Sequence, residues 1–291
     1  MAAVESEAPA LAATSYEECL RQCQLCRVGA SNALRATFIY SDPLGNIPIT
    51  SHPGALETLA SSFNVRSRES KRRRFGFSSS EDAVTWVVFT YLLRSGQLVK
   101  SLRQANLTSA PLNATPAVLL WGVPVDDGLE GPRIRARLTD LCLALGETAT
   151  AFSEPDVIVD FGEDGILFVE VKHRSGNDWK SAAYGGWQKY LSAASVHWNA
   201  AAVAESGAYE LARNWCLMNL LARGRESTLV NLGPKTLFQG EEGERLSRFV
   251  DAIEVDDRHR FASIAWPDLI GDLSKDGPEW FAKFCSQRRL A

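Results

Sequence analysis

The chain has 291 residues, 45% hydrophobic and 23% charged, which is typical of a folded globular protein with one large domain or two small ones. Its formal net charge of −4 argues against a general polyanion-binding protein, because contacts with many phosphates need an excess of Lys and Arg. No run approaches the roughly 18 apolar residues of a membrane span, the acidic N-terminus is unlike a secretory signal, and the six cysteines do not suggest a disulfide framework. We therefore expect an intracellular, cytoplasmic protein that does not bind membranes.

The N-terminal region, residues 1–76, is expected to form helix and loop ahead of a main domain over 77–291. Residues 15–35 are predicted to be helical and include Cys19, Cys23 and Cys26. This spacing matches the radical-SAM iron–sulfur motif, but that motif follows the first strand of a β/α barrel, and no strand is predicted here. Ordinary helical cysteines are the favoured interpretation, and a metal-cluster enzyme or a zinc site remains the alternative.

A basic segment follows, in which Arg72, Arg73 and Arg74 stand next to Lys71 in an otherwise acidic chain. One interpretation is a solvated loop before a helix, or a localisation tag. The other is a nucleic-acid contact, because a cationic segment beside a catalytic site is where a phosphate backbone would approach.

The first elements of the main domain have clear boundaries in the sequence. Serines, an acidic pair, a long apolar run and Gly96 predict a helix over about 80–95, buried on most sides. A run rich in β-branched and aliphatic residues predicts a strand over 116–125, and a helix is predicted over about 132–146.

Residues 155–172 read PDVIVDF, GEDG and ILFVEVK, which predicts an antiparallel hairpin of two β-rich runs joined by a turn. Because side chains alternate along a strand, Asp156, Ile158 and Asp160 share one face of the first strand, and Glu170 and Lys172 share one face of the second. Two carboxylates and a lysine would then meet in apolar surroundings, which is unfavourable unless another group, such as a bound cation, compensates them.

Pro155-Asp156, thirteen residues, and then Glu170-Val171-Lys172 across a predicted hairpin resembles the signature of the PD-(D/E)xK nuclease superfamily. The resemblance implies an α/β restriction-endonuclease-like core, in which helices flank a mixed central β-sheet, here with helical N- and C-terminal additions. It also implies a metal-dependent nuclease that hydrolyses phosphodiester bonds of DNA.

The resemblance assigns roles to the matched residues. Asp156, Glu170 and the Val171 carbonyl would hold Mg²⁺, for which Mn²⁺ could substitute, and Lys172 would assist the attacking water. Glu81, at the start of the predicted helix, could be a further metal ligand. It could instead cap that helix, because a serine three residues earlier completes a capping-box pattern.

Gln188 is a fourth candidate catalytic residue, on a helix predicted to follow the second strand. Lys180, Tyr184 and Gln188 would share one face of that helix, and by resemblance Gln188 would contact the water or a phosphate. The RecB-like branch has Gln-x-x-x-Tyr here, whereas this chain has Ser192 in place of the tyrosine. A solvent-facing helix side is the alternative. His173 is a candidate phosphate contact or an incidental residue at a strand end.

The C-terminal region is predicted to extend the sheet through a helix over 208–224, a strand over 228–233, a helix over 241–253 and a strand over 261–269. Three functional classes follow: a metal-dependent deoxyribonuclease, a catalytically inactive protein of the same fold that binds nucleic acid or a protein partner, and the metal-cluster enzyme. The expected partner is nucleic acid, DNA in particular, and a homodimer is left open.

Overall fold

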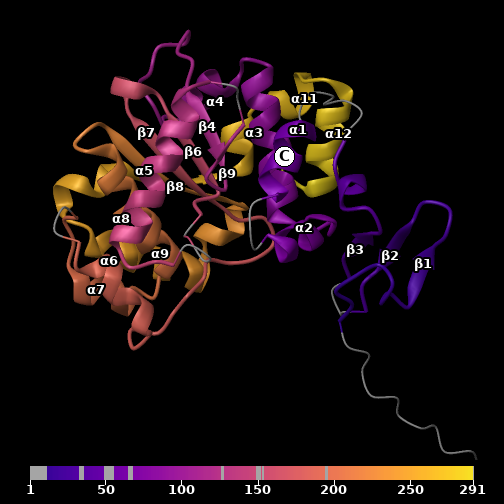
Figure 1. The fold of residues 1–291 in the computed structure, drawn as a ribbon, viewed down its shortest axis with the longest axis horizontal. Coiled ribbons are helices and arrows are strands. Elements are labelled where there is room, and N and C mark those ends of the chain that lie inside the picture. The colour runs from indigo at the N-terminus through magenta and orange to yellow at the C-terminus, as the bar shows by residue number, and fades with distance from the viewer. Residues whose placement is uncertain are drawn as a thin grey trace, which may run out of the picture.

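The structure, a computed structural model, describes most of the chain. Its described residues are 12–32, 36–48, 56–64, 68–125, 128–148, 152, 154–193 and 196–290. They form a mixed six-stranded sheet with helices on both faces, and a separate three-stranded sheet near the N-terminus (Figure 1). The expected α/β class with a mixed central sheet is confirmed. Within these ranges no helix is both long enough and apolar enough to cross a membrane.

The large sheet is built from both halves of the chain. Its strands are β4 (Ala117–Leu120), β5 (Val123–Pro124), β6 (Val157–Asp160), β7 (Ile166–Val171), β8 (Ser227–Gly233) and β9 (Phe261–Ala265). The order is β5-β4-β6-β7-β8-β9, antiparallel up to β7 and parallel from β7 to β9. The hairpin predicted over 155–172 is confirmed as β6 and β7, and the first predicted C-terminal strand is confirmed as β8. The strand predicted over 261–269 is confirmed only as far as Ala265, because helix α10 (Trp266–Ile270) begins there with a proline in its first turn.

The single strand predicted over 116–125 is wrong, because β4 and β5 are two strands of a tight hairpin. Trp121 and Gly122 connect them, with positive φ angles of 51° and 70°. Left-handed conformation at both central residues is the signature of the two-residue turn that matches the twist of paired strands. The chain therefore reverses inside the apolar run, and β5 becomes a short edge strand.

Helices cover both faces of the sheet. One face carries α1 (Leu56–Phe63), α2 (Glu69–Phe75), α3 (Glu81–Arg94), α4 (Leu98–Gln104), α10 (Trp266–Ile270), α11 (Leu273–Asp276) and α12 (Glu279–Arg288). The other carries α5 (Glu130–Ala144), α6 (Gln188–Leu191), α7 (Ala200–Ser206), α8 (Tyr209–Ala222) and α9 (Gly240–Ala252). Short 3-10 helices are η1 (Pro43–Asn46), η4 (Gly162–Asp164), η5 (Gly185–Trp187), η6 (Lys235–Phe238) and η7 (Val255–Arg260).

Helix α3 confirms the helix predicted over 80–95. Ser80 is its N-cap, and the serine hydroxyl accepts a hydrogen bond from the Ala83 amide. All residues from Ala83 to Leu92 are buried, as the nearly continuous apolar run indicated. Helix α5 likewise confirms the helix predicted over 132–146, which begins two residues earlier at Glu130.

Alternate residues of β6 and β7 pack on opposite faces of the sheet. Val157 and Val169 belong to the core shared with α3, whereas Ile158 and Phe168 belong to the core shared with α5 and α8. Glu170 is two residues beyond Phe168, so its side chain is on the α8 face. The end of β7 therefore directs polar side chains towards the first turn of α8.

The helix predicted over 15–35 is wrong, and so the N-terminal addition is partly a sheet. Strands β1 (Arg21–Cys23), β2 (Val28–Ala30) and β3 (Phe38–Tyr40) form an antiparallel meander that projects from the main body (Figure 1). A small core of Ala13, Tyr16, Cys19 and Ile39 holds it together. Gly29 allows this packing, because a Cβ there would lie 2.7 Å from Cys19 Sγ. Contacts distant in sequence thus override the local helical preference.

Candidate active site

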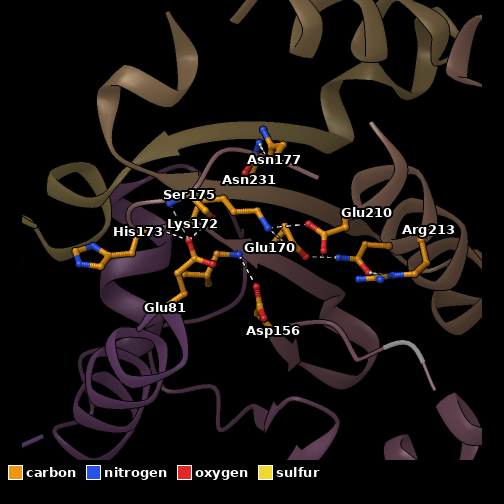
Figure 2. Close-up of polar contacts among 12 residues, drawn as sticks. Glu81, Asp156, Glu170, Lys172, His173, Ser175, Asn177, Glu210, Arg213 and Asn231 are labelled. Atoms are coloured by element: carbon orange, nitrogen blue, oxygen red, sulfur yellow. Dashed lines mark hydrogen bonds and ion pairs between the residues drawn. The ribbon is translucent and has the colours of Figure 1, made fainter. Parts of the chain in front are cut away.

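The end of the β6–β7 hairpin opens into a cavity of about 490 Å³. Asp156, Glu170 and Lys172 all line it, so the structure brings the three matched residues together (Figure 2). Glu81 and Glu210 line the same cavity from helices α3 and α8. Acidic side chains from three parts of the chain therefore surround one lysine.

Asp156 lies just before β6 and is held by the partner strand. Its Oδ2 atom accepts a hydrogen bond of 2.8 Å from the Val171 amide. The ladder between β6 and β7 ends at the pair Val157–Val169, so Val171 lies beyond the last paired residue of β6. The N–H and C=O of one strand residue point to the same side, and hence the Val171 carbonyl also faces the Asp156 edge.

Lys172 is buried between two carboxylates. Its Nζ atom is 2.7 Å from Glu170 Oε1 and 2.7 Å from Glu210 Oε2 (Figure 2). The backbone is fixed as well, because the Lys172 amide donates to the Leu232 carbonyl of β8 at 2.7 Å and the Trp266 indole donates to the Lys172 carbonyl at 3.0 Å. The ammonium group is therefore held in one place by both side-chain and main-chain contacts.

Glu170 has a second partner on α8. Asn214, fully buried, donates from Nδ2 to Glu170 Oε2 at 2.7 Å, and its own Oδ1 accepts from Arg213 Nε at 3.3 Å. Glu210 and Asn214 are one helical turn apart, so both face the end of β7. The hydrogen bonds of α8 thus orient both the carboxylate and the ammonium group.

Burial and charge shift the ionisation of this group of residues. Burial raises the pKa of Asp156, and the Glu170 carboxylate raises it further. Burial also raises the pKa of Glu170 against the opposing effect of Lys172. Burial alone would lower the pKa of Lys172, but the carboxylates of Glu170, Glu210 and Asp156 outweigh it and raise the pKa. The lysine therefore stays charged, whereas Asp156 and Glu170 resist being ionised together.

Glu210 shows the opposite shift from the other two carboxylates. Burial would raise its pKa, but Lys172 and Arg213 outweigh this effect and lower it. Glu210 is therefore the permanent counter-ion of the lysine. Sequence reasoning missed Glu210 and Asn214. Their signal was two polar residues four positions apart, on one face of a helix that is buried along most of its length.

Glu81 occupies the mouth of the cavity in a role that was not expected. Its Oε1 atom accepts hydrogen bonds from the His173 amide at 2.9 Å and from the Ser175 hydroxyl at 2.5 Å. The capping-box interpretation is wrong, because Ser80 is the N-cap and the Ser78 hydroxyl instead bonds to the Phe38 amide. Glu81 therefore ties the loop after β7 to α3, with its carboxylate still on the cavity wall.

Gln188 is not brought to this site. It is exposed at the start of α6 and lies outside the residues that line the cavity. The longer helix predicted around Lys180, Tyr184 and Gln188 is also wrong, because Gly185 and Gly186 form a 3-10 turn and only four helical residues follow. Two successive glycines disfavour a continuous helix by about 2 kcal/mol relative to alanines.

His173 is also unsuited to the phosphate contact considered for it. Its side chain is 7% exposed, and burial together with Arg174 and Arg288 lowers its pKa to about 4. The imidazole is therefore neutral near pH 7 and offers no positive charge to a phosphate.

The basic segment is helix α2 rather than a loop, and its cations have different surroundings. Arg74 lines the carboxylate cavity, as does Lys71, whose Nζ is 2.7 Å from Asp82 Oδ1. Arg72 lines a separate hollow that also includes Asp42, and Arg73 is exposed. Of the three arginines expected to bind nucleic acid, Arg74 is the one beside the proposed catalytic residues.

The oxygen atoms of the cavity are of the kind that a hard divalent cation prefers. Among the residues that the structure describes, no group of three or more His, Cys, Asp or Glu side chains is arranged to hold a metal ion. Mg²⁺, however, keeps several waters and takes few carboxylates. Asp156, Glu170 and the Val171 carbonyl supply such oxygens. A cation would favour the ionised form of both carboxylates, whose pKa is raised first by burial and then by a neighbouring carboxylate, Glu170 for Asp156 and Glu210 for Glu170. The residues therefore fit Mg²⁺.

The three N-terminal cysteines do not form a cluster. Cys19 is buried in the small core, whereas Cys23 and Cys26 are exposed, at the end of β1 and in the turn that follows it. The iron–sulfur alternative, which needs three converging cysteines, has no support in this geometry.

Comparison with known proteins identifies no relative of the chain. No family model, curated protein or solved structure matches the chain. The geometry of the cavity is therefore what indicates a function.

Proposed function

We propose that this chain is a Mg²⁺-dependent deoxyribonuclease of the PD-(D/E)xK type, with a restriction-endonuclease-like core. The observation that carries the proposal is the meeting of Asp156, Glu170 and Lys172 at the open end of the β6–β7 hairpin. A mixed sheet with helices on both faces, and an acid-bearing helix before the hairpin, is the arrangement that the sequence resemblance implies.

Asp156, Glu170 and the Val171 carbonyl would hold the cation. When bound, Mg²⁺ supplies charge stabilisation for a phosphoryl oxygen and lowers the pKa of a water molecule. The protein's own contribution is position: the Val171 amide orients Asp156, and Asn214 orients Glu170. Such hydrogen bonds to ligand carboxylates commonly change metal affinity or activity by about 10- to 100-fold.

Lys172 serves as a fixed positive charge. Because the neighbouring carboxylates raise its pKa, it stays protonated and is a poor base for the attacking water. A buried ammonium group held at one position instead stabilises negative charge that develops on the phosphate in the transition state. Glu210, on α8, keeps the Lys172 ammonium group in place by accepting a hydrogen bond from it.

Cations around the cavity provide a path for the phosphate backbone. Lys71, Arg74 and Arg174 line the same hollow as the carboxylates. Five carboxylates line the hollow as well, those of Glu81, Asp82, Asp156, Glu170 and Glu210, so these cations would contact phosphate together with a bound divalent cation. The net charge of −4 does not make the whole surface a polyanion binder.

A cleavage assay with the purified chain tests the proposal. Single-stranded DNA, double-stranded DNA and RNA of one sequence would be incubated with Mg²⁺, with Mn²⁺, or with chelator. We expect DNA cleavage that depends on the divalent cation. Binding of DNA with no cleavage under any of these conditions would instead favour the catalytically inactive alternative.

A further inference from the structure

The exposed cysteine pair in the small N-terminal sheet has the geometry of a metal-binding turn. Cys23 ends β1 and Cys26 lies just before β2, and both are exposed. The Cys26 amide points at Cys23 Sγ, with an N···S distance of 3.5 Å. The turn closes through a hydrogen bond of 2.9 Å from the Arg27 amide to the Cys23 carbonyl, and Arg27 has a φ angle of 56°.

A pair of thiolates that binds a metal ion needs these features. Two cysteines separated by two residues on a tight turn place both sulfurs on one side of the chain, and this spacing recurs in zinc sites. A peptide N–H directed at sulfur favours the thiolate, which is the form that binds metal. The left-handed residue after the second cysteine turns the chain back into β2, and both cysteines of the turn are exposed.

Cys19 does not belong to this pair. Its thiol donates to the Ser15 carbonyl at 3.4 Å, and its side chain packs against Tyr16 in the small core. The other three cysteines, Cys142, Cys216 and Cys285, are buried in the main domain. Exposure therefore separates Cys23 and Cys26 from the cysteines that serve packing.

Two thiolates are half of a structural zinc site. Zn²⁺ in such sites takes four ligands in a tetrahedron. In the described parts of the chain, no His, Cys, Asp or Glu side chain joins Cys23 and Cys26 to make a group of three. A second copy of the chain would supply the missing pair, since a two-fold axis through the ion relates two identical turns.

The surface around the turn suits such a contact. Leu25, between the two cysteines, is 95% exposed, and Leu20, just before β1, is 75% exposed. A second chain that binds the same ion at this turn would also cover these apolar side chains, which favours the contact. The small sheet projects from the main body, so the exposed turn is accessible to a second copy (Figure 1).

We propose that Cys23 and Cys26 form half of a Zn²⁺ site, which the same pair of a second copy completes, so that one ion joins two chains through their N-terminal sheets. This inference does not depend on the proposed nuclease activity. It gives the cysteine pair an ion to bind, and it predicts that the chain forms a zinc-dependent dimer.

The test measures metal content and mass together on the full chain, kept reduced with a phosphine. After loading with Zn²⁺ and dialysis, we expect one tightly held ion per two chains and a dimer by light scattering, and a monomer after chelation. Loading with Co²⁺ should give the intense thiolate-to-metal absorption of a four-sulfur site. Cys23→Ser and Cys26→Ser should each lose the ion, the absorption and the dimer.

Two controls separate this site from the carboxylate cavity and from general effects on the sheet. Gln24→Ser changes an exposed residue of the same turn and should leave the ion and the dimer intact. Asp156→Ala removes a cavity carboxylate and should leave both unchanged. One ion per monomeric chain, a dimer that survives both chelation and loss of the cysteines, or no retained zinc would each overturn the proposal.

Discussion

Lys172 Nζ lies 2.7 Å from Glu210 Oε2, although the two residues are 38 positions apart in the sequence. The contact joins the end of β7 to the first turn of α8, so it exists only when the helix is packed on the sheet. Glu210 is the counter-ion that keeps the lysine charged and leaves Glu170 as a candidate ligand for the cation. The site is therefore a network of two layers rather than a hairpin motif alone.

Replacing Glu210 should impair catalysis without removing any matched motif residue. Glu210→Ala leaves Lys172 with one carboxylate partner, and we expect cleavage to fall by about 10- to 100-fold, as is usual for residues that orient catalytic groups. Glu210→Gln keeps a hydrogen-bond acceptor and should retain more activity. The measurement is the single-turnover cleavage rate at saturating Mg²⁺.

The matched control for Glu210 is Glu205→Ala, an exposed glutamate on the preceding helix α7. It should cleave like the unaltered chain. Equal activity for Glu210→Ala and Glu205→Ala would contradict the positioning role. Circular dichroism of each variant would show whether α8 remains folded.

Asp156→Asn should stabilise the metal-free fold near neutral pH. Burial and Glu170 raise the pKa of Asp156 above its ordinary value of 3.8, so the folded chain binds this proton more tightly than the unfolded chain does. Proton binding at Asp156 thus adds to the free energy of unfolding. This contribution is fully present below about pH 3.8 and is lost as the pH rises through the higher folded pKa. Asparagine keeps the acceptor for the Val171 amide and removes the charge.

Thermal unfolding with chelator checks this prediction across a pH series. The gain from Asp156→Asn should be present near pH 7 and shrink in acid. Asp140→Asn, at an exposed position on α5, should change little at either pH. A lower melting temperature for Asp156→Asn at pH 7 would show that the carboxylate stabilises the fold instead.

His173 should make the fold sensitive to mild acid. Its pKa is about 4 in the folded chain, against an ordinary value of 6.5. Between these two pH values the unfolded chain binds the proton and the folded chain does not. The free energy of unfolding is therefore highest above about pH 6.5 and falls towards pH 4, by at most about 1.4 kcal/mol per pH unit. His173→Gln should flatten this slope.

Urea unfolding with chelator at several pH values would measure the slope. His259→Gln removes an exposed histidine and should leave the acid sensitivity unchanged. If His173→Gln and the unaltered chain lose stability in parallel between pH 6.5 and pH 4, His173 is not the responsible group.

Arg74 should contribute more to DNA binding than its two neighbours in α2. It lines the carboxylate cavity, whereas Arg72 lines a separate hollow and Arg73 lies near Glu18. Arg74→Ala should reduce the slope of log K against log salt by about 1, because one phosphate contact is lost. Fluorescence anisotropy at several salt concentrations, in Ca²⁺ to limit cleavage, measures this slope. Arg248→Ala on α9 is the control, and an equal effect there would mean a non-specific loss of charge.

The hairpin and the helices with strong boundary signals could be predicted from the sequence. The apolar, β-branched runs VIVD and ILFVEV predict β6 and β7, the alternation of side chains along a strand sets the face that carries Glu170, and Ser80 marks the start of α3. These features are local, because they depend on residues within a few positions of one another. The Asp156–Glu170–Lys172 convergence follows from the pairing of two adjacent strands.

What could not be predicted depends on contacts distant in sequence. The N-terminal sheet forms because Tyr16 and Cys19 pack with Ile39, which local propensity does not show. Glu210 reaches Lys172 through the packing of α8, and no spacing rule connects them. Gln188 was placed by analogy with a motif that the chain only partly matches, and Gly185-Gly186 interrupts the helix that would have directed it inward.

The most direct measurement compares Mg²⁺-dependent cleavage of DNA by Lys172→Ala with cleavage by Lys100→Ala, an exposed lysine on α4. Loss of the buried Lys172 ammonium group should lower the single-turnover rate by at least about 100-fold, the range for removal of a group that stabilises transition-state charge. The Lys100 variant should cleave normally, and both should retain the far-ultraviolet spectrum of the unaltered chain. Cleavage by Lys172→Ala at the rate of the control would contradict the assignment of this cavity as the active site.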